Sequence, residues 1–277
     1  MLERVGREAR IPWIALVVVA CIVTMAILSP WVTPTAEQGR LLDRLHPPLL
    51  FGGNWSHPLG TDDLGRDILL RLIGGAGVSL AVSVVGVGLA ALVGTAAGVP
   101  AGYFGGWLDS LLMRLVDVTL SMPVILLAML AAVRFGPSTA NVAVVIALLL
   151  WARFARLARG EALTLRVRPF IEGARALGAS HWRIMVRHLV PHLLGSLLVL
   201  ATLMIGWAIL TEASLSFLGA GVPAPAPAWG SMVASGQDLL ATAWWVSTIP
   251  GAMIAVLIVA SNVIGDWLRD RLDPGQL

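Results

Sequence analysis

The side chains that could carry chemistry gather in one basic segment of an otherwise apolar chain. Eight arginines lie between Arg153 and Pro191, and the run 172–178 inside this segment reads as a short helix that ends at a glycine. A charged side chain at the bilayer centre costs about 2.5 to 3.5 kcal/mol on insertion scales, so eight would cost roughly 20 kcal/mol or more. We therefore expect the segment to lie in water and to present a structured surface to a partner protein.

The residue types needed for most catalysis are missing or isolated. All 19 basic residues are arginine, which excludes a phosphate-binding P-loop and Schiff-base chemistry, because both need a lysine amine. Cys21 is the only cysteine, so neither an internal disulfide nor a cysteine-rich metal site can form. His188 and His192 have the i, i+4 spacing of a metal pair but no evident third ligand. Since the apolar segments also lack GxSxG, HExxH and paired-carboxylate patterns, we expect neither catalytic residues nor a metal site.

An acidic residue within a strongly apolar segment is a further candidate. Glu212 has no basic neighbour one helical turn away, and ionisable residues inside membrane spans mark functional sites by default. Two interpretations stay open: Glu212, Ser214 and Ser216 line a polar translocation path, or the carboxyl group hydrogen-bonds nearby hydroxyl groups. Arg114 and Asp117, three residues apart, are instead expected to pair with each other on one helix face.

The composition places these residues in a polytopic membrane protein. Hydrophobic residues make up 57% of the 277 positions and charged residues 13%, against about 25% charged in a soluble domain, and the mean hydropathy is +0.85. The pI near 10.3 would suit a nucleic-acid partner, but the segregation of the arginines argues against one. Six segments are apolar and nearly long enough, or longer, to cross about 30 Å of hydrocarbon as helices: 12–32, 74–100, 108–133, 140–158, 192–218 and 244–265.

The arginines also predict how the chain crosses the membrane. With the N-terminus inside, fourteen arginines fall on the cytoplasmic side and five on the other, as the positive-inside rule requires. Both termini and the segment 159–191 are then cytoplasmic, and the segments 33–73 and 219–243 lie outside.

Small residues predict close helix packing within the membrane. Gly94, Gly98 and Gly102 recur every four residues in the second span, so another helix can approach them closely. That helix belongs either to this chain or to a partner chain, and both alternatives stay open. The tryptophans near the start of the last span, Trp229 among them, are expected in an interfacial aromatic belt.

The segment from Glu172 to Gly178, with the later run His188-Leu189-Val190-Pro191, resembles the EAA loop of ABC-importer permeases. The resemblance implies a coupling helix, from about Phe170 to Leu177, that docks in a groove of an ATPase subunit. Gly173 replaces the usual second alanine, which lowers helix propensity slightly, and Gly178 suits a left-handed C-cap. The residues assigned to ATPase coupling are Glu172, Gly173, Ala174, Arg175, Leu177 and Gly178.

Further runs are similar to the dipeptide, oligopeptide and nickel permease subfamily, and they cover residues 57–67, 211–219, 229–232 and 265–274. The resemblance extends over nearly everything from residue 57 onward, and the layout before it fits the C-type subunit of the subfamily. It implies an all-α polytopic membrane protein with six transmembrane helices and the type I ABC importer permease fold.

The charge pattern and the resemblance divide the chain into parts. These are the cytoplasmic N-terminus and first anchor at 1–32, an extracytoplasmic segment at 33–73, a permease core at 74–265 with the cytoplasmic coupling loop 159–191, and a cytoplasmic tail at 266–277. The first apolar run is longer than a cleavable signal core, so a retained anchor is expected. The charged residues of the 57–67 run either contact an external binding protein or only order the local chain. They are Asp62, Asp63, Arg66 and Asp67.

The resemblance implies a permease subunit of an ATP-driven importer in the bacterial inner membrane, which forms half of the path for dipeptides, oligopeptides or similar solutes. Its implied partners are a second, homologous permease in a heterodimer, two ABC ATPases that bind ATP and Mg²⁺, an extracytoplasmic binding protein and membrane lipid. No nucleic acid and no cofactor of this chain's own are implied. The same machinery could import nickel chelates, glutathione or opines. The rival function is an ion-coupled secondary transporter, which usually has inverted repeats, and we find no internal repeat.

Overall fold

The structure is a computed structural model that describes residues 11–136 and 138–272. In this part of the chain the regular elements are helical and no strand occurs. The α-helices are α1 (Trp13–Ala36), α2 (Ile68–Phe104), α3 (Gly106–Ser121), α4 (Val124–Phe135), α5 (Thr139–Leu165), α6 (Pro169–Ala176), α7 (His181–Ile184), α8 (Val190–Phe217), α9 (Trp229–Gly236) and α10 (Trp245–Leu272). Short 3-10 turns cover Leu41–Asp43, Leu49–Phe51 and Gln237–Leu239, and a π-helical turn covers Met185–Leu189.

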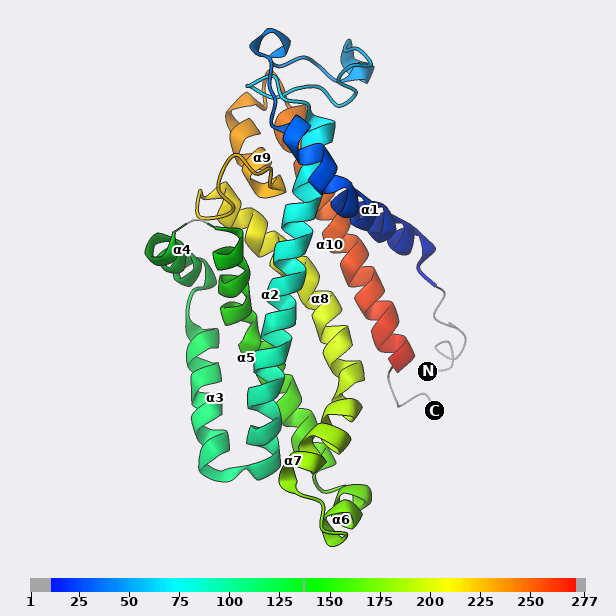
Figure 1. Cartoon of the computed structure of the whole chain (residues 1–277), viewed down its shortest axis with the longest axis vertical. Helices are drawn as coiled ribbons and strands as arrows, with labels where there is room; N and C mark the ends of the chain where they lie inside the picture. The colour runs from blue at the N-terminus through cyan, green and yellow to red at the C-terminus, as the bar shows by residue number, and fades with distance from the viewer. Residues whose placement is uncertain (1–10, 137, 273–277) are drawn as a thin grey trace, which may run out of the picture.

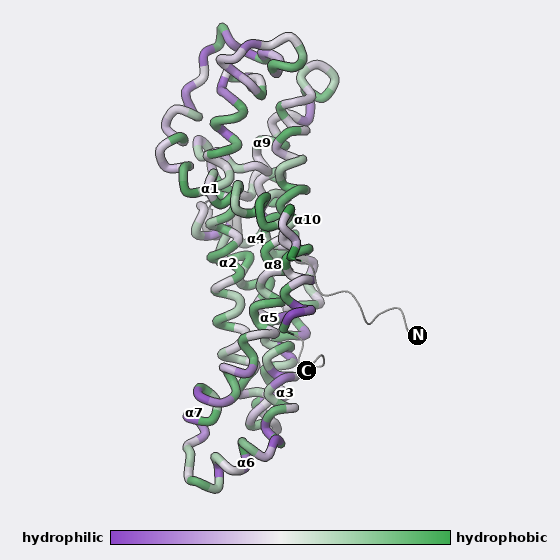
Figure 2. The backbone as a smooth tube through the Cα atoms, turned by 90° about the vertical axis from the view of Figure 1, so that its right-hand side faces the viewer, coloured by the Kyte–Doolittle hydropathy of each residue, from purple (hydrophilic) through white to green (hydrophobic). Residues whose placement is uncertain are grey.

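The long helices form an elongated bundle with α6 at one end and residues 37–67 at the other (Figure 1). These are called the α6 end and the loop end below. Hydrophilic residues gather toward both ends, and hydrophobic residues surround the middle (Figure 2). Helices α1, α2, α5, α10, and α8 with its preceding turns are long and apolar enough to cross a membrane, and the bent pair α3–α4 adds a sixth candidate. The predicted all-α polytopic architecture is therefore confirmed.

Helix α2 is longer than the predicted second span, because the Asp67 side chain caps its N-terminus several residues before the apolar run begins. It begins at Ile68 instead of residue 74 and reaches Phe104. Asp67 Oδ1 accepts a hydrogen bond from the backbone N–H of Leu70 at 3.0 Å, which satisfies a first-turn donor.

The third span, predicted at 108–133, consists of two helices with a break between them. Helix α3 ends at Ser121, and Met122 has an extended backbone with φ −80° and ψ 139°. The two halves of the span, α3 and α4, are bent by 94° relative to each other. Pro123 lies at the break, where its ring disfavours a helical conformation for Met122 and its missing N–H interrupts the hydrogen-bond ladder.

The glycines of α2 form a close contact with α5 of the same chain. A Cβ atom at Gly94 would lie 2.5 Å from the carbonyl oxygen of Trp151, and one at Gly98 would lie 2.3 Å from that of Ala155. A Cβ atom at Gly102 would lie 2.5 Å from the carbonyl oxygen of Arg159, one turn further along α5. Of the two alternatives for these glycines, the structure therefore favours packing within the subunit.

Charged side chains tie α3 to α5. Arg156 Nη2 donates to Asp117 Oδ1 at 2.7 Å, and the Arg159 guanidinium binds both carboxylate oxygens of Asp109. The expected pair of Arg114 with Asp117 is wrong, because the antiparallel approach of α5 brings Arg156 to this carboxylate. Three-residue spacing on one helix made the pair possible, but it could not exclude a competitor from another helix.

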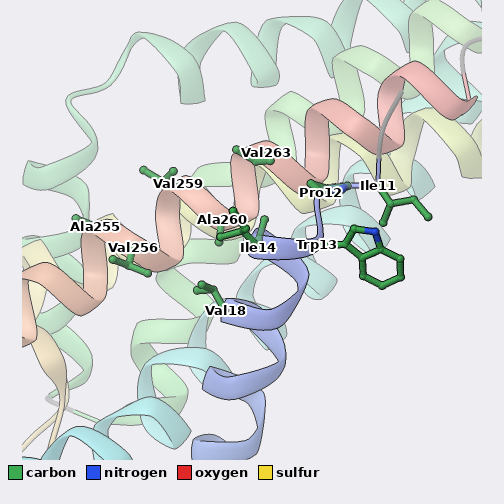
Figure 3. Close-up of a pocket in the computed structure, with 11 residues that line it drawn as sticks. Ile11, Pro12, Trp13, Ile14, Val18, Ala255, Val256, Val259, Ala260 and Val263 are labelled. Atoms are coloured by element: carbon green, nitrogen blue, oxygen red, sulfur yellow. The ribbon is translucent and has the colours of Figure 1, made fainter. Parts of the chain in front are cut away.

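A groove of about 700 Å³ lies between α1 and α10, with Ile14, Val18, Val259 and Val263 among the side chains that line it (Figure 3). None of the residues that line it is charged. The acyl chains of lipid suit such a surface, whereas the groove offers no partner for a charged ligand.

Candidate functional site

The basic segment is largely helical. Helix α5 continues through it to Leu165, α6 follows, and helical structure resumes at His181 and leads into α8. The connection between these long helices is therefore residues 166–180, which is shorter than the predicted loop 159–191. Helix α6 projects from the bundle at this end of the molecule (Figure 1).

Helix α6 ends as its sequence predicts. Gly178 has φ of +80°, in the left-handed region. The backbone N–H of Gly178 donates to the carbonyl oxygen of Arg175 at 3.0 Å, and that of Ala179 donates to Ala174 at 3.0 Å. These two bonds define a Schellman motif, which turns the chain sharply toward α7. At the other end Pro169 occupies the first helical turn, where its missing N–H costs nothing.

Tyr103, the only tyrosine in the chain, links this segment to the end of α2. Its hydroxyl oxygen lies 2.9 Å from His181 Nδ1 and accepts a hydrogen bond from Arg175 Nη2 at 3.4 Å. The Arg175 guanidinium also lies over the Tyr103 ring, 5.7 Å from its centroid. Arg166 Nη1 donates to the carbonyl oxygen of Gly102 at 3.1 Å. Several polar contacts therefore join the α6 segment to a membrane span.

Sequence reasoning did not find Tyr103, Arg166 or His181 as members of this site. The one available signal was the position of a unique tyrosine at the end of a span, just before two glycines. Ile171, completely buried, adds an apolar anchor on the inner side of α6.

The outer side of α6 and the turn after it stay exposed. Glu172, Gly173 and Gly178 are exposed, whereas Ala174 is partly buried. The Leu177 side chain is 90% exposed, and Trp182 is 72% exposed. Exposed apolar side chains beside arginines are typical of a protein-binding patch. We call this patch the α6 surface: Val167, Phe170, Glu172, Gly173, Arg175, Leu177 and Trp182.

At the loop end, the charged run 57–67 is held mostly by its own contacts. Asp62 is only 3% exposed, and its Oδ2 accepts from Arg66 Nε at 2.7 Å and from Arg71 Nη1 at 2.8 Å. Its other oxygen accepts from the backbone N–H groups of Leu64 and Arg66, both at 2.9 Å. Asp67, besides capping α2, lies 2.8 Å from His57 Nδ1. These contacts agree with the alternative in which the run orders the local chain.

The predicted contacts of this run with a binding protein need a correction. Asp62 and Asp67 are enclosed, so neither can reach a partner without rearrangement of the segment, whereas Asp63 and Arg66 are partly exposed. Burial of this kind was not visible in the sequence, because it depends on α10: Trp245 Nε1 donates to the carbonyl oxygen of Thr61 at 3.1 Å.

Asp62→Ala is expected to open the loop end. The change leaves Arg71, which is buried, without its carboxylate, and removing one partner of a buried ion pair costs about 3–5 kcal/mol. Limited proteolysis of the purified protein with trypsin should then cut at Arg40, Arg44 or Arg66 several times faster. Asp63→Ala is the matched control, because its carboxylate makes no ion pair within the described residues. Equal cleavage rates for the two variants would contradict the expectation.

Comparison with known proteins agrees with this architecture. Residues 94–276 match the family described as binding-protein-dependent transport system inner membrane component. The chain belongs to this family. It is thus a multi-pass membrane permease, a transport subunit of an ABC importer.

Relatives extend the similarity beyond the family match to nearly the whole permease. It is 41% identical over 264 residues to a peptide transport system permease protein of Brucella suis, covering 94% of this chain and 86% of the relative. It is 39% identical to the glutathione transport system permease protein of Pectobacterium atrosepticum, covering 92% and 84% of the two chains. It is 37% identical to the dipeptide transport system permease protein of Alkalihalophilus pseudofirmus, covering 97% and 87%.

A solved structure supports the fold independently. An inward-facing structure of the MetNI methionine ABC transporter aligns with a TM-score of 0.57 at 20% identity, covering 74% of this chain and 97% of that one. The ABC importer permease fold is therefore confirmed.

Glu212 of the permease lies in a small buried polar cluster between α2 and α8. Its side chain is 0% exposed, and it accepts hydrogen bonds from Ser79 Oγ at 2.9 Å and from Ser216 Oγ at 2.7 Å. Ser214 is not part of the cluster, because it is partly exposed and donates to the carbonyl oxygen of Leu210 at 2.7 Å. The structure thus brings Glu212 and Ser216 together and places Ser214 on another face of α8. A role of the three residues in a translocation path stays a prediction.

Glu212→Ala is expected to weaken the contact between α2 and α8. The hydroxyl groups of Ser79 and Ser216 would lose their acceptor in a buried site, and an unsatisfied buried polar group costs about 1–3 kcal/mol. The melting temperature in detergent should fall for Glu212→Ala and fall less for Glu212→Gln, whose amide carbonyl keeps one acceptor. Melting of the alanine variant at the wild-type temperature would speak against this role of Glu212.

Proposed function

We propose that this permease forms half of the membrane path in an ATP-driven importer of dipeptides, oligopeptides or similar small solutes. The names of its relatives, which refer to peptide, dipeptide and glutathione transport systems, support this class of solute. The observation that carries the proposal is the α6 surface, where the exposed Leu177 directly follows a short helix that is tied to α2 through Tyr103. A surface of this kind needs a partner, and a chain without lysine cannot supply a P-loop of its own.

The proposed partner at the α6 surface is an ATPase subunit. Two such subunits would bind and hydrolyse ATP with Mg²⁺, one on this permease and one on a second, homologous permease in a heterodimer. The coupling residues are Glu172, Gly173, Ala174, Arg175, Leu177 and Gly178. When the ATPases close on ATP, a pull on α6 would pass through Tyr103 to α2 and shift the bundle between two arrangements.

The proposed orientation places the α6 end and both termini in the cytoplasm. In this orientation fourteen arginines fall on the cytoplasmic side and five on the opposite side, which supports it. The loop end would then meet the extracytoplasmic binding protein, through the partly exposed Asp63 and Arg66 and through exposed apolar tips such as Leu50 and Trp55. The residues proposed for the path stay Glu212, Ser214 and Ser216, of which Ser214 is partly exposed.

Transport in vesicles tests the proposal against an ion-coupled secondary transporter. The permease is reconstituted with its partner permease, ATPases and binding protein, and uptake of dialanine, trialanine and glutathione is measured. We expect uptake of at least one of these compounds only when hydrolysable ATP is present on the side of the membrane that carries the ATPases. The rate of this uptake should not change when ion gradients are collapsed. Uptake that persists without ATP and stops when the gradients are collapsed would favour the rival.

The solute itself is best identified through the binding protein. Mass spectrometry of the ligand retained on the co-expressed binding protein should show a peptide or a peptide-like compound. A nickel chelate or an opine would keep the ATP-driven mechanism and replace the proposed solute.

A further inference from the structure

Helix α5 carries three arginines at three-residue intervals, and one of them differs from the others. Arg156 and Arg159 each pair with an aspartate of α3. Arg153 makes no ion pair anywhere in residues 11–136 and 138–272. Its guanidinium instead lies over the Trp207 ring of α8, 5.1 Å from the centroid, and Nη1 lies 3.6 Å from Met204 Sδ. An unpaired, exposed cation therefore lies at the contact between two spans.

This cation lies on a helix that is long and apolar enough to be a membrane span. Arg153 is near the middle of α5, and its contacts Met204 and Trp207 are near the middle of α8, both helices being candidate spans. The sequence had suggested that Arg153 begins the water-exposed basic segment, but the structure continues α5 well past it. A cation that faces lipid within a span is costly, and such residues usually face a water-filled cavity or the bundle interior.

The direction of the side chain strengthens the point. A helical side chain leans toward the N-terminus of its own helix. Because α5 runs from its start beside α4 toward the α6 end (Figure 1), this tendency favours a direction away from the α6 end for Arg153. Helix α8 runs the opposite way, so Trp207 leans toward the incoming guanidinium. A lipid-facing arginine that snorkels to the α6 end would instead point away from this contact.

We propose that Arg153 is an anion-binding residue of the translocation path and that its ligand is a carboxylate group of the solute. The contact with Trp207 restrains the guanidinium, and its Nε and Nη2 stay available to donate two parallel hydrogen bonds to a carboxylate. Peptides and glutathione carry such a group, so the inference rests on the proposed function. An exposed site of this kind binds weakly enough to release the solute onward.

Charge replacement at position 153 tests the assignment. In a Cys21→Ser background, R153C is assembled with its partner subunits, and uptake is measured for whichever of dialanine, trialanine and glutathione the wild type imports fastest. We expect a loss of at least about tenfold, the equivalent of one charge-assisted hydrogen bond. Modification of the thiol with aminoethyl methanethiosulfonate, which adds a positive charge, should restore part of the uptake. Modification with sulfonatoethyl methanethiosulfonate, which adds a negative charge, should not. Arg114→Gln, an exposed arginine outside the contact of α5 with α8, is the control and should retain uptake.

Three results would overturn the proposal. They are wild-type uptake by unmodified R153C, equal uptake after cationic and anionic modification, and failure of the introduced thiol to react with either charged reagent in the assembled transporter. The last result would place the side chain in lipid or in a dry interface. If the wild type imports none of the three compounds, the proposed function fails and the carboxylate assignment falls with it. Labelling of the R153C thiol would then still report whether this position faces water.

Discussion

Gly178→Val is expected to abolish coupling between ATP hydrolysis and transport while the protein still inserts into the membrane. Gly178 has φ of +80°, a conformation that costs an L-residue about 1–2 kcal/mol and a β-branched residue more. Valine would therefore disrupt the Schellman motif and redirect the chain between α6 and α7. ATP hydrolysis stimulated by loaded binding protein, measured on the reconstituted complex, should fall by at least about tenfold, because the misdirected Leu177 would lose its proposed contact with the ATPase subunit.

Gly160→Val is the matched control for this change. Gly160 is an exposed helical glycine of α5 in the same basic region, and a Cβ atom there would meet nothing within 4 Å. Its replacement should leave stimulated hydrolysis intact, since valine is no worse than glycine in a helix. Gly178→Asn should retain more activity than Gly178→Val, because asparagine tolerates the left-handed region. Full stimulation in Gly178→Val would rule out the proposed role of this turn.

Gly98→Leu is expected to prevent normal folding of the helix bundle. Even the first carbon of a side chain would lie 2.3 Å from the backbone carbonyl oxygen of Ala155, which cannot rotate away. The two helices would have to separate and would lose the close approach at Gly94 and Gly102 as well. Overpacking usually costs about 1–3 kcal/mol, and loss of the neighbouring contacts adds to it.

Folded yield and melting temperature in detergent measure this effect. Gly88→Leu lies on the same helix, where a Cβ atom meets nothing within 4 Å, and should behave like the wild type. Gly98→Ala should fall between the two. Similar yields and melting temperatures for the leucine variants at 98 and 88 would show that the packing of α2 on α5 tolerates a side chain.

Local features of the candidate site were predictable from the sequence. The helix expected from about Phe170 to Leu177 is found at Pro169–Ala176, and Gly178 has the left-handed conformation expected of a C-cap. A proline at the start and a glycine after the end fix both boundaries through bonds within a few residues. The break in the third span has an equally local cause, because Pro123 removes a backbone donor within the apolar run.

Long-range features of the site were not predictable. Asp117 pairs with Arg156 and not with Arg114, and Ser79 of α2 completes the polar cluster of Glu212. Both outcomes depend on which helix faces meet. A single sequence does not contain that information, because many pairings satisfy the same apolar pattern.

The sequence by itself determined that this is a polytopic membrane permease with an arginine-rich helical projection. Lipid forces each apolar span to satisfy its backbone hydrogen bonds within a helix, and contacts between residues close in sequence then set the helix ends. Only the tertiary structure decided that Tyr103 holds this projection and that Arg153 lies against Trp207 without an ion pair among the described residues. Both contacts join residues from separate helices. Their formation therefore depends on the packing of glycines and the tilt of whole helices, which no local pattern specifies.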